Sequence, residues 1–306
     1  MARLGASDLN ANANANANAN ANANANANAG ASVTTFAANV RYNSQAFARL
    51  LLPGEFPVAP TNPAEQIAYD AAEAAANKVK FRKYWDAELR ASIYLNEFLT
   101  KNTTWMDTLK AALADTYEEL KREKGKQLRG VLEVSDEREE RFLEIVDQDG
   151  EGVLRYWLAM LTIDAASAPA TYQLIRVGRR VGEVVVMCLK EHYGVARPSQ
   201  VCPAIVPLLG PPVHPSFPAG HALQSHLISR CLLEAGWAGD QRQMLYQLSR
   251  RISENRIIAG VHYKADIDAG VIAADQCFEL LREGQLFKTL MIEAKAEAQK
   301  TYGEEG

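Results

Sequence analysis

Three short segments in the second half of the chain carry basic residues and histidines at spacings that suit the binding of an oxyanion. They are residues 190–198, 215–221 and 256–266. Lysine and arginine form strong, charge-assisted hydrogen bonds to the oxygens of phosphate-like anions, and histidine can transfer protons near neutral pH. We therefore predict that the three segments meet in one positively charged pocket for a tetrahedral oxyanion such as phosphate or vanadate.

Each segment taken alone also has an ordinary structural explanation. Lys190 lies near a predicted helix end, where a basic residue complements the helix dipole. Pro218 and Gly220 shape the start of a helix, whose free N–H groups attract anions in many proteins. A pair such as His262 and Asp266 can also be a simple surface contact. The combination of the three segments, rather than any one of them, predicts a site.

Two histidines are placed to act on a bound substrate. His221 stands at the predicted helix start, where it could donate a proton to whatever binds there. His262 and Asp266 are four residues apart, so the two side chains can lie on one face if this segment is helical. An acidic partner on one ring nitrogen fixes the tautomer and leaves the other nitrogen as a nucleophile or a ligand.

Together the three segments resemble the signature of the type 2 phosphatidic acid phosphatase and vanadium-dependent haloperoxidase superfamily. That signature reads Lys-x6-Arg-Pro, then Pro-Ser-Gly-His, then Ser-Arg-x5-His-x3-Asp. The chain departs from it at two positions, because Ala219 and Asn255 stand where the family has serine. The resemblance covers roughly residues 157–281, and the proline-rich stretch 197–218 is most similar to soluble bacterial members related to haloperoxidases.

The resemblance implies how the anion would be held. Lys190, Arg197 and Arg256 would bind the equatorial oxygens of phosphate or vanadate, and the backbone N–H of Gly220 would add a donor. His262 would be the apical group, which attacks phosphorus in a phosphatase or is the vanadate ligand in a haloperoxidase.

The resemblance also implies the roles of the two remaining side chains. Asp266 would orient His262, and His221 would protonate a leaving alkoxide or handle the proton of bound peroxide. Ala219 removes a hydroxyl that binds the anion, and such a hydrogen bond is worth about 1.5–3 kcal/mol. We expect weaker anion binding unless a neighbour, Ser216 or His214, replaces that hydroxyl.

Helical signals dominate from residue 64 onward and predict an all-α fold, a bundle of about eight to ten helices with the oxyanion pocket in its C-terminal half. Residues 1–63 read as a disordered tail of alternating Asn and Ala followed by an irregular arm. Residues 64–306 read as a single catalytic domain. The predicted helices span residues 64–80, 83–99, 105–123, 137–146, 152–163, 169–192, 220–235, 240–258, 264–282 and 286–300.

The bulk properties exclude some classes of partner. The chain has 306 residues, a net charge of −4 and 48% apolar residues, which is ordinary for a globular protein and argues against a nucleic-acid partner. No segment reads as a secretory signal or a membrane span. We expect a soluble, cytoplasmic protein that acts on small molecules, and the resemblance implies possible homo-oligomers.

Three functions are compatible with these residues. A vanadate-dependent haloperoxidase, which oxidises halide with hydrogen peroxide, is favoured by the proline-rich stretch and the absence of predicted spans. The alternative is a soluble acid-phosphatase-like phosphomonoesterase that acts through a phosphohistidine, because vanadate mimics the transition state of phosphoryl transfer. The second alternative is a noncatalytic oxyanion-binding protein, in which Ala219 marks the loss of activity.

Overall fold

The computed structural model describes residues 62–76, 86–237 and 242–302. The chain divides into two compact units, Met1–Asp86 and Ala87–Gly306. In the first unit the described residues form helix α3, Pro63–Ala76. The Asn–Ala repeat lies outside the described residues, and the domain boundary predicted after residue 63 remains a prediction.

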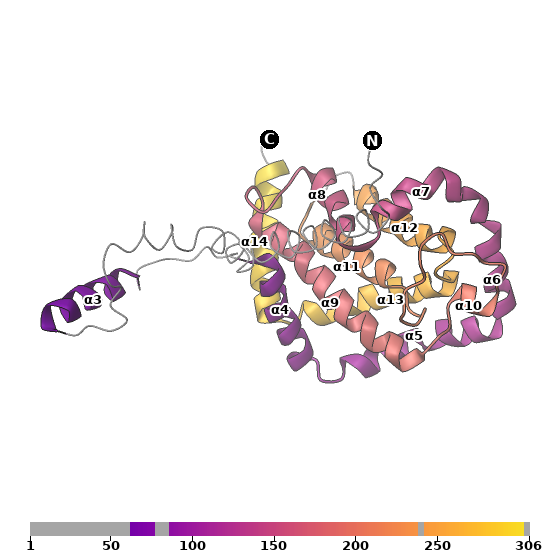
Figure 1. The fold of residues 1–306 in the computed structure, drawn as a ribbon, viewed down its shortest axis with the longest axis horizontal. Helices are drawn as coiled ribbons and strands as arrows, with labels where there is room; N and C mark the ends of the chain where they lie inside the picture. The colour runs from indigo at the N-terminus through magenta and orange to yellow at the C-terminus, as the bar shows by residue number, and fades with distance from the viewer. Residues whose placement is uncertain (1–61, 77–85, 238–241, 303–306) are drawn as a thin grey trace, which may run out of the picture. The chain divides into compact units, whose positions relative to one another are not determined.

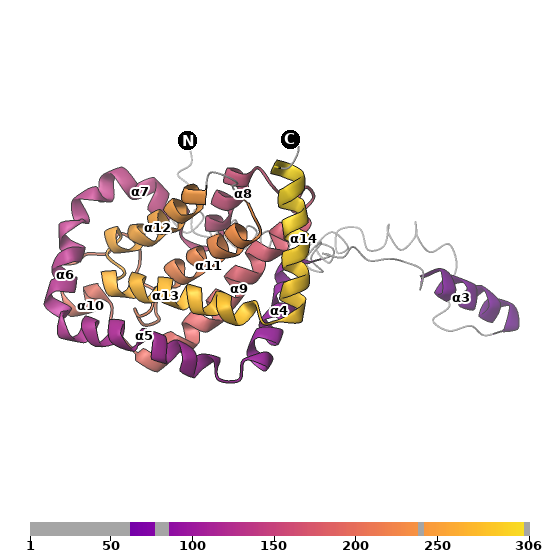
Figure 2. The same cartoon turned by 180° about the vertical axis from the view of Figure 1, so that it is seen from behind.

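The second unit is all-α, and its described residues contain no strand, which confirms the predicted fold class (Figures 1 and 2). Two short 3-10 helices, η1 and η2, flank α7. The elements are α4 Ala87–Lys101, α5 Trp105–Arg122, α6 Lys124–Glu133, η1 Ser135–Glu137, α7 Arg138–Asp147, η2 Gly150–Leu154, α8 Arg155–Leu161, α9 Pro169–Tyr193, α10 Pro198–Val201, α11 Gly220–Glu234, α12 Arg242–Ile258, α13 Lys264–Leu281 and α14 Gln285–Tyr302.

Helix α11 lies between α9 and α13 and packs closely against both (Figures 1 and 2). Gly182 on α9 permits this approach, since a Cβ there would lie 2.9 Å from side-chain atoms of Leu223 and Gln224. Gly270 on α13 does the same, because its Cβ would lie 2.7 Å from the backbone oxygen of Ala219. Helices α9, α11 and α13, which carry Lys190, His221 and Asp266, are therefore held at short distance.

Two helix starts are satisfied by carboxylates from other helices. Glu97 on α4 accepts hydrogen bonds from the N–H groups of Leu286 and Phe287 at the start of α14. Glu297 on α14 accepts the N–H groups of Ala170 and Thr171 at the start of α9. A carboxylate stabilises a helix N-terminus because it pairs with free donors and opposes the helix dipole. These bonds join α4, α9 and α14.

The helix boundaries agree with the sequence in most places. Helix α9 ends at Tyr193, one residue after its predicted end, and the following Gly194 has a positive φ of 59°, which favours glycine. Helix α6 lies in a stretch where no helix was predicted, because its polar sequence has a single buried position, Val131. The proline-rich stretch also contains the short helix α10.

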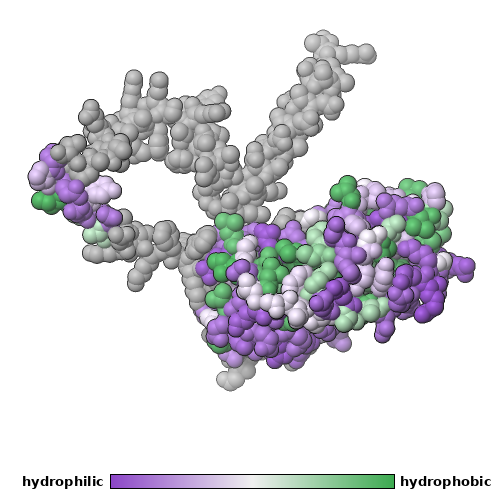
Figure 3. Space-filling model, turned by 90° about the horizontal axis from the view of Figure 1, so that it is seen from below, coloured by the Kyte–Doolittle hydropathy of each residue, from purple (hydrophilic) through white to green (hydrophobic). Residues whose placement is uncertain are grey.

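Hydrophilic residues cover much of the face of this unit shown in Figure 3, with hydrophobic residues in smaller groups. Within the ranges that the structure describes, every helix is too short or too polar to cross a membrane.

Candidate active site

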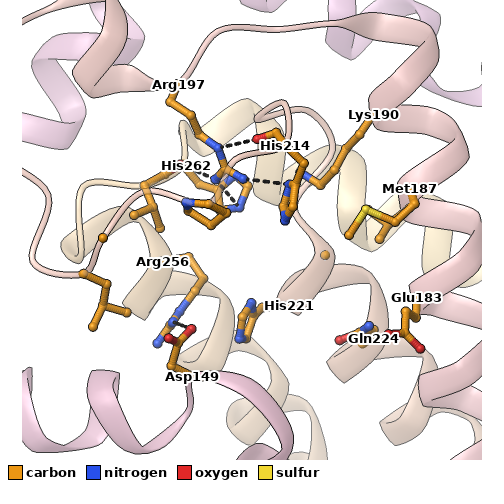
Figure 4. A pocket seen from close by; sticks show the side chains of 16 residues that line it. Asp149, Glu183, Met187, Lys190, Arg197, His214, His221, Gln224, Arg256 and His262 are labelled. Carbon is orange, nitrogen blue, oxygen red and sulfur yellow. Dashed lines mark hydrogen bonds and ion pairs between the residues drawn. The ribbon is translucent and has the colours of Figure 1, made fainter. Parts of the chain in front are cut away.

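The three motif segments meet in one pocket of about 370 Å³, as predicted (Figure 4). Asp266 is fully buried behind the pocket wall, where it contacts His262. The structure thus brings together every residue that the sequence singled out. The predicted residues that line the pocket are Lys190, Arg197, Gly220, His221, Arg256 and His262.

His262 and Asp266 form a buried pair at the start of a helix. Helix α13 begins at Lys264, so His262 precedes it and Asp266 lies in its first turn. Asp266 Oδ2 is 2.8 Å from His262 Nδ1, and it also accepts the Tyr263 N–H at 3.0 Å and the Ser216 hydroxyl at 2.5 Å. The expected contact exists, and the two side chains meet across the start of the helix, which begins at residue 264 as predicted. The carboxylate turns back toward the free donors of the helix start.

The tautomer of His262 follows from its two neighbours. Arg197 Nη1 lies 3.1 Å from Nε2, and a guanidinium can only donate hydrogen bonds. Nε2 therefore carries the lone pair, and Nδ1 carries the proton that is donated to Asp266. Burial, followed by the charges of Lys190 and Arg197, lowers the pKa of His262 well below its ordinary value. His262 is a neutral imidazole whose lone pair faces a cation.

Lys190 and Arg197 are held by backbone carbonyl groups. Lys190 Nζ donates to the carbonyl oxygens of Pro215 and Ser216, both at 2.7 Å, and Arg197 Nη1 donates to that of Val261 at 2.7 Å. Burial, followed by the charge of Arg197, lowers the pKa of Lys190 to about 7, and burial lowers that of Arg197 to about 10. Buried charges of this kind gain from an anionic partner.

Arg256 reaches the pocket from the last turn of α12. Its Nη2 donates to the carbonyl of Ile145 at 2.9 Å, and Nη1 lies 3.9 Å from Asp149 Oδ1. Its Nε is buried and has no hydrogen-bond partner among the described residues. Burial lowers the pKa of Arg256 to about 10. A buried donor without an acceptor is costly, so the site fits an anion that would supply acceptor oxygens.

The start of α11 adds backbone donors. The first N–H bonded within the helix is that of Leu223, which donates to the carbonyl of Ala219 at 3.1 Å. The N–H groups of Gly220, His221 and Ala222 therefore take no part in the helix ladder. The Ala219 N–H donates to the carbonyl of Asp266 at 2.9 Å, which ties this helix start to that of α13.

His221 lines the same pocket, and within the described ranges only one of its ring nitrogens has a hydrogen-bond partner. Its Nε2 lies 3.0 Å from the backbone carbonyl of Gln148. Burial, followed by the charge of Arg256, lowers the pKa of His221 to about 3, although the bond to Gln148 acts in the opposite direction. His221 is therefore neutral before an anion enters.

The hydroxyl missing at Ala219 is not replaced by Ser216, which is fully buried and directs its own hydroxyl to Asp266. His214 does line the pocket, and its Nδ1 lies 3.1 Å from Arg197 Nη2. The guanidinium only donates, whereas the Pro215 carbonyl, 3.3 Å from the same Nδ1, only accepts. The shorter contact, to Arg197, favours an accepting Nδ1 and a proton on Nε2. Of the two candidates, His214 is the one placed to donate to an anion.

The pocket residues outside the motifs include four whose side chains the sequence did not single out, namely Asp149, Glu183, Met187 and Gln224. The spacing of Glu183 and Met187 relative to Lys190 places all three on one face of α9, a signal that could have identified them. Gln148 acts through its backbone carbonyl, which no side-chain pattern reveals.

A comparison with protein-family models finds no match, and a comparison with curated proteins finds no relative. Among solved structures, a transmembrane PAP2-type phosphatidylglycerolphosphate phosphatase from Bacillus subtilis is similar, with a TM-score of 0.44 and 16% sequence identity. The similarity covers 59% of this chain and 95% of that chain.

Proposed function

We propose that this protein is a phosphomonoesterase that acts through a phosphohistidine at His262. One observation carries the proposal. His262 is held as a neutral imidazole, with Nδ1 donating to Asp266 and the Nε2 lone pair facing Arg197 inside a pocket lined by cations. A nucleophile with a fixed lone pair, beside groups that bind phosphoryl oxygens, has the parts needed for phosphoryl transfer.

The first step follows from this arrangement. The phosphoryl oxygens of the ester accept hydrogen bonds from Lys190, Arg197 and Arg256, and from the N–H groups at the start of α11. His262 Nε2 attacks phosphorus, an N–P bond forms, and the P–O bond to the alcohol breaks. Asp266 stabilises the positive charge that develops on the ring.

His221 handles the proton. An incoming phosphoester brings negative charge next to Arg256 and His221, which raises the pKa of His221 from its low value in the anion-free pocket. His221 then protonates the leaving oxygen as the alcohol departs. In the second step water loses a proton to His221 and attacks phosphorus, the N–P bond breaks, and phosphate and free His262 result.

The absence of a side-chain hydroxyl at Ala219 favours an anion that binds as a substrate over one that stays bound as a cofactor. A resident cofactor must stay bound through many turnovers, whereas a substrate must be released as product. Loss of one hydrogen bond to a charged group weakens anion binding by about tenfold to a hundredfold. Weaker anion binding lowers the occupancy of a vanadate cofactor, whereas it speeds the release of phosphate from a phosphatase.

The second candidate is the vanadate-dependent haloperoxidase. Its support is the neutral His262 Nε2, which suits a ligand of vanadium, together with Lys190, Arg197 and Arg256 for the vanadate oxygens. Bound vanadate would supply the activation of hydrogen peroxide for halide oxidation.

Two assays on one preparation separate these candidates. We expect hydrolysis of p-nitrophenyl phosphate that vanadate inhibits, and no bromination of a phenol-red-type dye by hydrogen peroxide and bromide with added vanadate. Vanadate-dependent bromination without hydrolysis would replace the proposal with the haloperoxidase. Inactivity in both assays, with bound phosphate shown by calorimetry, would leave a noncatalytic binding protein.

Trapping tests the covalent step. The wild type, quenched in alkali during turnover of labelled phosphoester, should carry acid-labile phosphate. His262→Ala should carry none and should lose turnover while keeping its circular dichroism spectrum. Label that persists in His262→Ala would assign the nucleophile elsewhere.

A further inference from the structure

An asparagine precedes Arg256 where the superfamily signature has serine, and the structure gives it contacts that serine cannot make. Asn255 Nδ2 donates to Gln148 Oε1 at 2.9 Å and to Glu144 Oε1 at 3.0 Å. Its Oδ1 accepts from Arg141 Nη1 at 3.1 Å, and the side chain is fully buried. A serine hydroxyl has one hydrogen to donate and a shorter reach, so it cannot serve three partners in this way.

Gln148 is fixed by both its side chain and its backbone. It lies directly after α7, yet it is fully buried. Its Nε2 donates to Glu144 Oε1 at 3.0 Å, and its N–H donates to the Glu144 carbonyl at 3.0 Å. With the bond from Asn255, both the nitrogen and the oxygen of its side-chain amide are hydrogen-bonded, and these contacts set the position of its backbone carbonyl.

Glu144 determines which way the two amides point. Burial raises the pKa of Glu144, but hydrogen bonds from Arg251 and Asn255 outweigh that effect and keep the pKa below its ordinary value. An ionised carboxylate only accepts, so the amide nitrogens of Asn255 and Gln148 must face it. The amide oxygen of Gln148 then has to accept from Asn255.

The carbonyl of Gln148 in turn determines the tautomer of His221. A carbonyl only accepts, so His221 Nε2, at 3.0 Å, carries a hydrogen in both the neutral and the charged ring. Proton uptake and release are left to Nδ1, which has no hydrogen bond to any described residue. Since His221 lines the pocket, Nδ1 is the atom available to a substrate.

We propose that Asn255 and Gln148 are positioning residues that hold His221 in the Nε2–H tautomer, so that it exchanges its proton with substrate through Nδ1. The part of this proposal that concerns the leaving group rests on the proposed phosphomonoesterase activity; the tautomer does not. A purely structural role, in which Asn255 only joins α12 to α7, is the competing explanation.

Arg138 supplies a matched control for that competing role. It also joins α7 to the end of α12, because its Nε donates to the carbonyl of Ile258 at 2.7 Å and its Nη1 to that of Val206 at 2.7 Å. It has no hydrogen bond to Asn255 or Gln148. Arg138→Gln therefore weakens the same junction and leaves the contacts of His221 in place.

Histidine-selective ¹⁵N NMR tests the tautomer in the anion-free protein, in which His221 is neutral. The signals of His221 are assigned by their loss in His221→Gln. We expect the Nε2–H tautomer in the wild type and in Arg138→Gln, and a mixture of tautomers in Asn255→Ala and Gln148→Ala. Asn255→Ser serves as the milder variant if the alanine variant does not fold. An unchanged His221 spectrum in Asn255→Ala and Asn255→Ser would overturn the proposal.

Leaving-group dependence tests the consequence for proton transfer. Propyl phosphate needs a protonated leaving oxygen, whereas 2,4-dinitrophenyl phosphate does not. Asn255→Ala should lower kcat/KM for propyl phosphate by about 10- to 100-fold and for the dinitrophenyl ester by less than about threefold, because an acid catalyst accelerates only the first reaction strongly. Arg138→Gln should not change the ratio. Equal losses for both esters would assign Asn255 a structural role only. A wild type that hydrolyses neither ester would refute the proposed function, and the NMR result would still decide the tautomer.

Discussion

His262 and His221 carry their protons on opposite ring nitrogens, and a different acceptor fixes each one. The acceptor for His262 Nδ1 is the carboxylate of Asp266, and the acceptor for His221 Nε2 is the carbonyl of Gln148. A carboxylate stabilises a positive ring far more than a carbonyl does. This difference suits a nucleophile that becomes positively charged and an acid that has to give its proton away.

Asp266→Asn should be milder than removal of the side chain. The hydrogen bonds to Asp266 converge on Oδ2, while Oδ1 is buried without a partner among the described residues. The amide oxygen can take the place of Oδ2 and keep the tautomer of His262, so the main loss is the negative charge. We expect kcat to fall by about 10- to 30-fold, against about 10³-fold or more for Asp266→Ala. Steady-state kinetics of both variants checks this, and equal losses would contradict it.

Lys190 should make anion binding depend on pH. Burial lowers its folded-state pKa to about 7 from 10.5, so between these values the unfolded chain binds a proton that the folded chain lacks. The contribution of Lys190 to the free energy of unfolding therefore rises with pH across this window. A bound anion favours the protonated lysine, so the rise in Tm caused by sulfate should shrink as the pH increases from about 6 to 9.

The control for this pH effect is Lys190→Met. It should show a smaller sulfate effect at low pH and little change with pH. A wild-type sulfate effect that is constant over the same range would contradict a titrating lysine in the site. Sulfate is the probe because it does not itself titrate in this range.

Ala219→Ser should tighten anion binding by about tenfold, because it restores a hydroxyl at the start of α11. Ser216 does not supply that hydroxyl, since its own is donated to Asp266. Residue 219 is also the N-cap of α11, where serine is favoured over alanine, so the free energy of unfolding should rise by about 1 kcal/mol if the hydroxyl caps the helix instead. Vanadate inhibition constants and urea denaturation distinguish these outcomes. Unchanged anion affinity would indicate that His214 already fills the role.

Most helices could be predicted from the sequence, because the spacing of apolar residues, proline at helix N-termini and glycine after helix C-termini indicate the same boundaries. It was not sufficient for α6, which is stabilised by tertiary contact at Val131 rather than by an apolar stripe. The predicted start of the helix at residue 264 is correct and leaves His262 outside it, although the spacing of His262 to Asp266 would also fit one helix face. In the structure the same four-residue spacing spans the start of α13, where the carboxylate of Asp266 also accepts the Tyr263 N–H.

The close approach of α11 and α13 makes Gly270 a sensitive position. A Cβ there would lie 2.7 Å from both Ala219 O and Ala222 Cβ, so one helix has to shift at the point where Gly220 enters the pocket. We expect Gly270→Ala to lower the free energy of unfolding by about 2–3 kcal/mol and to weaken anion binding.

Gly130→Ala on α6 is the matched control, because a Cβ there meets nothing within 4 Å. It should leave anion affinity unchanged and stabilise the helix by up to about 1 kcal/mol. Urea denaturation and vanadate inhibition of both variants provide the measurements. Equal unfolding free energies and vanadate inhibition constants for the two alanine variants would show that the contact between α11 and α13 does not determine stability or anion affinity.

At the scale of the whole molecule, the motif spacings were enough to predict a common pocket, although its segments are far apart in the chain. A net charge of −4 would not have suggested it, because net charge says nothing about local clustering. The contact of Gln148 with His221 was not predictable, since it is made by a backbone carbonyl and is anchored through Asn255.

The carboxylate of Glu297 also determines how late during synthesis the start of α9 gains its hydrogen-bond partner. The helix start that it satisfies, at Ala170, lies 127 residues earlier, and the far end of that same helix carries Lys190. During synthesis the emerging α9 therefore lacks this partner until the ribosome has released the segment that contains α14. Over that interval its first donors depend on water or on other proteins. The final assembly of the pocket is thus expected to follow translation of α14 rather than to accompany the motif segments as they emerge.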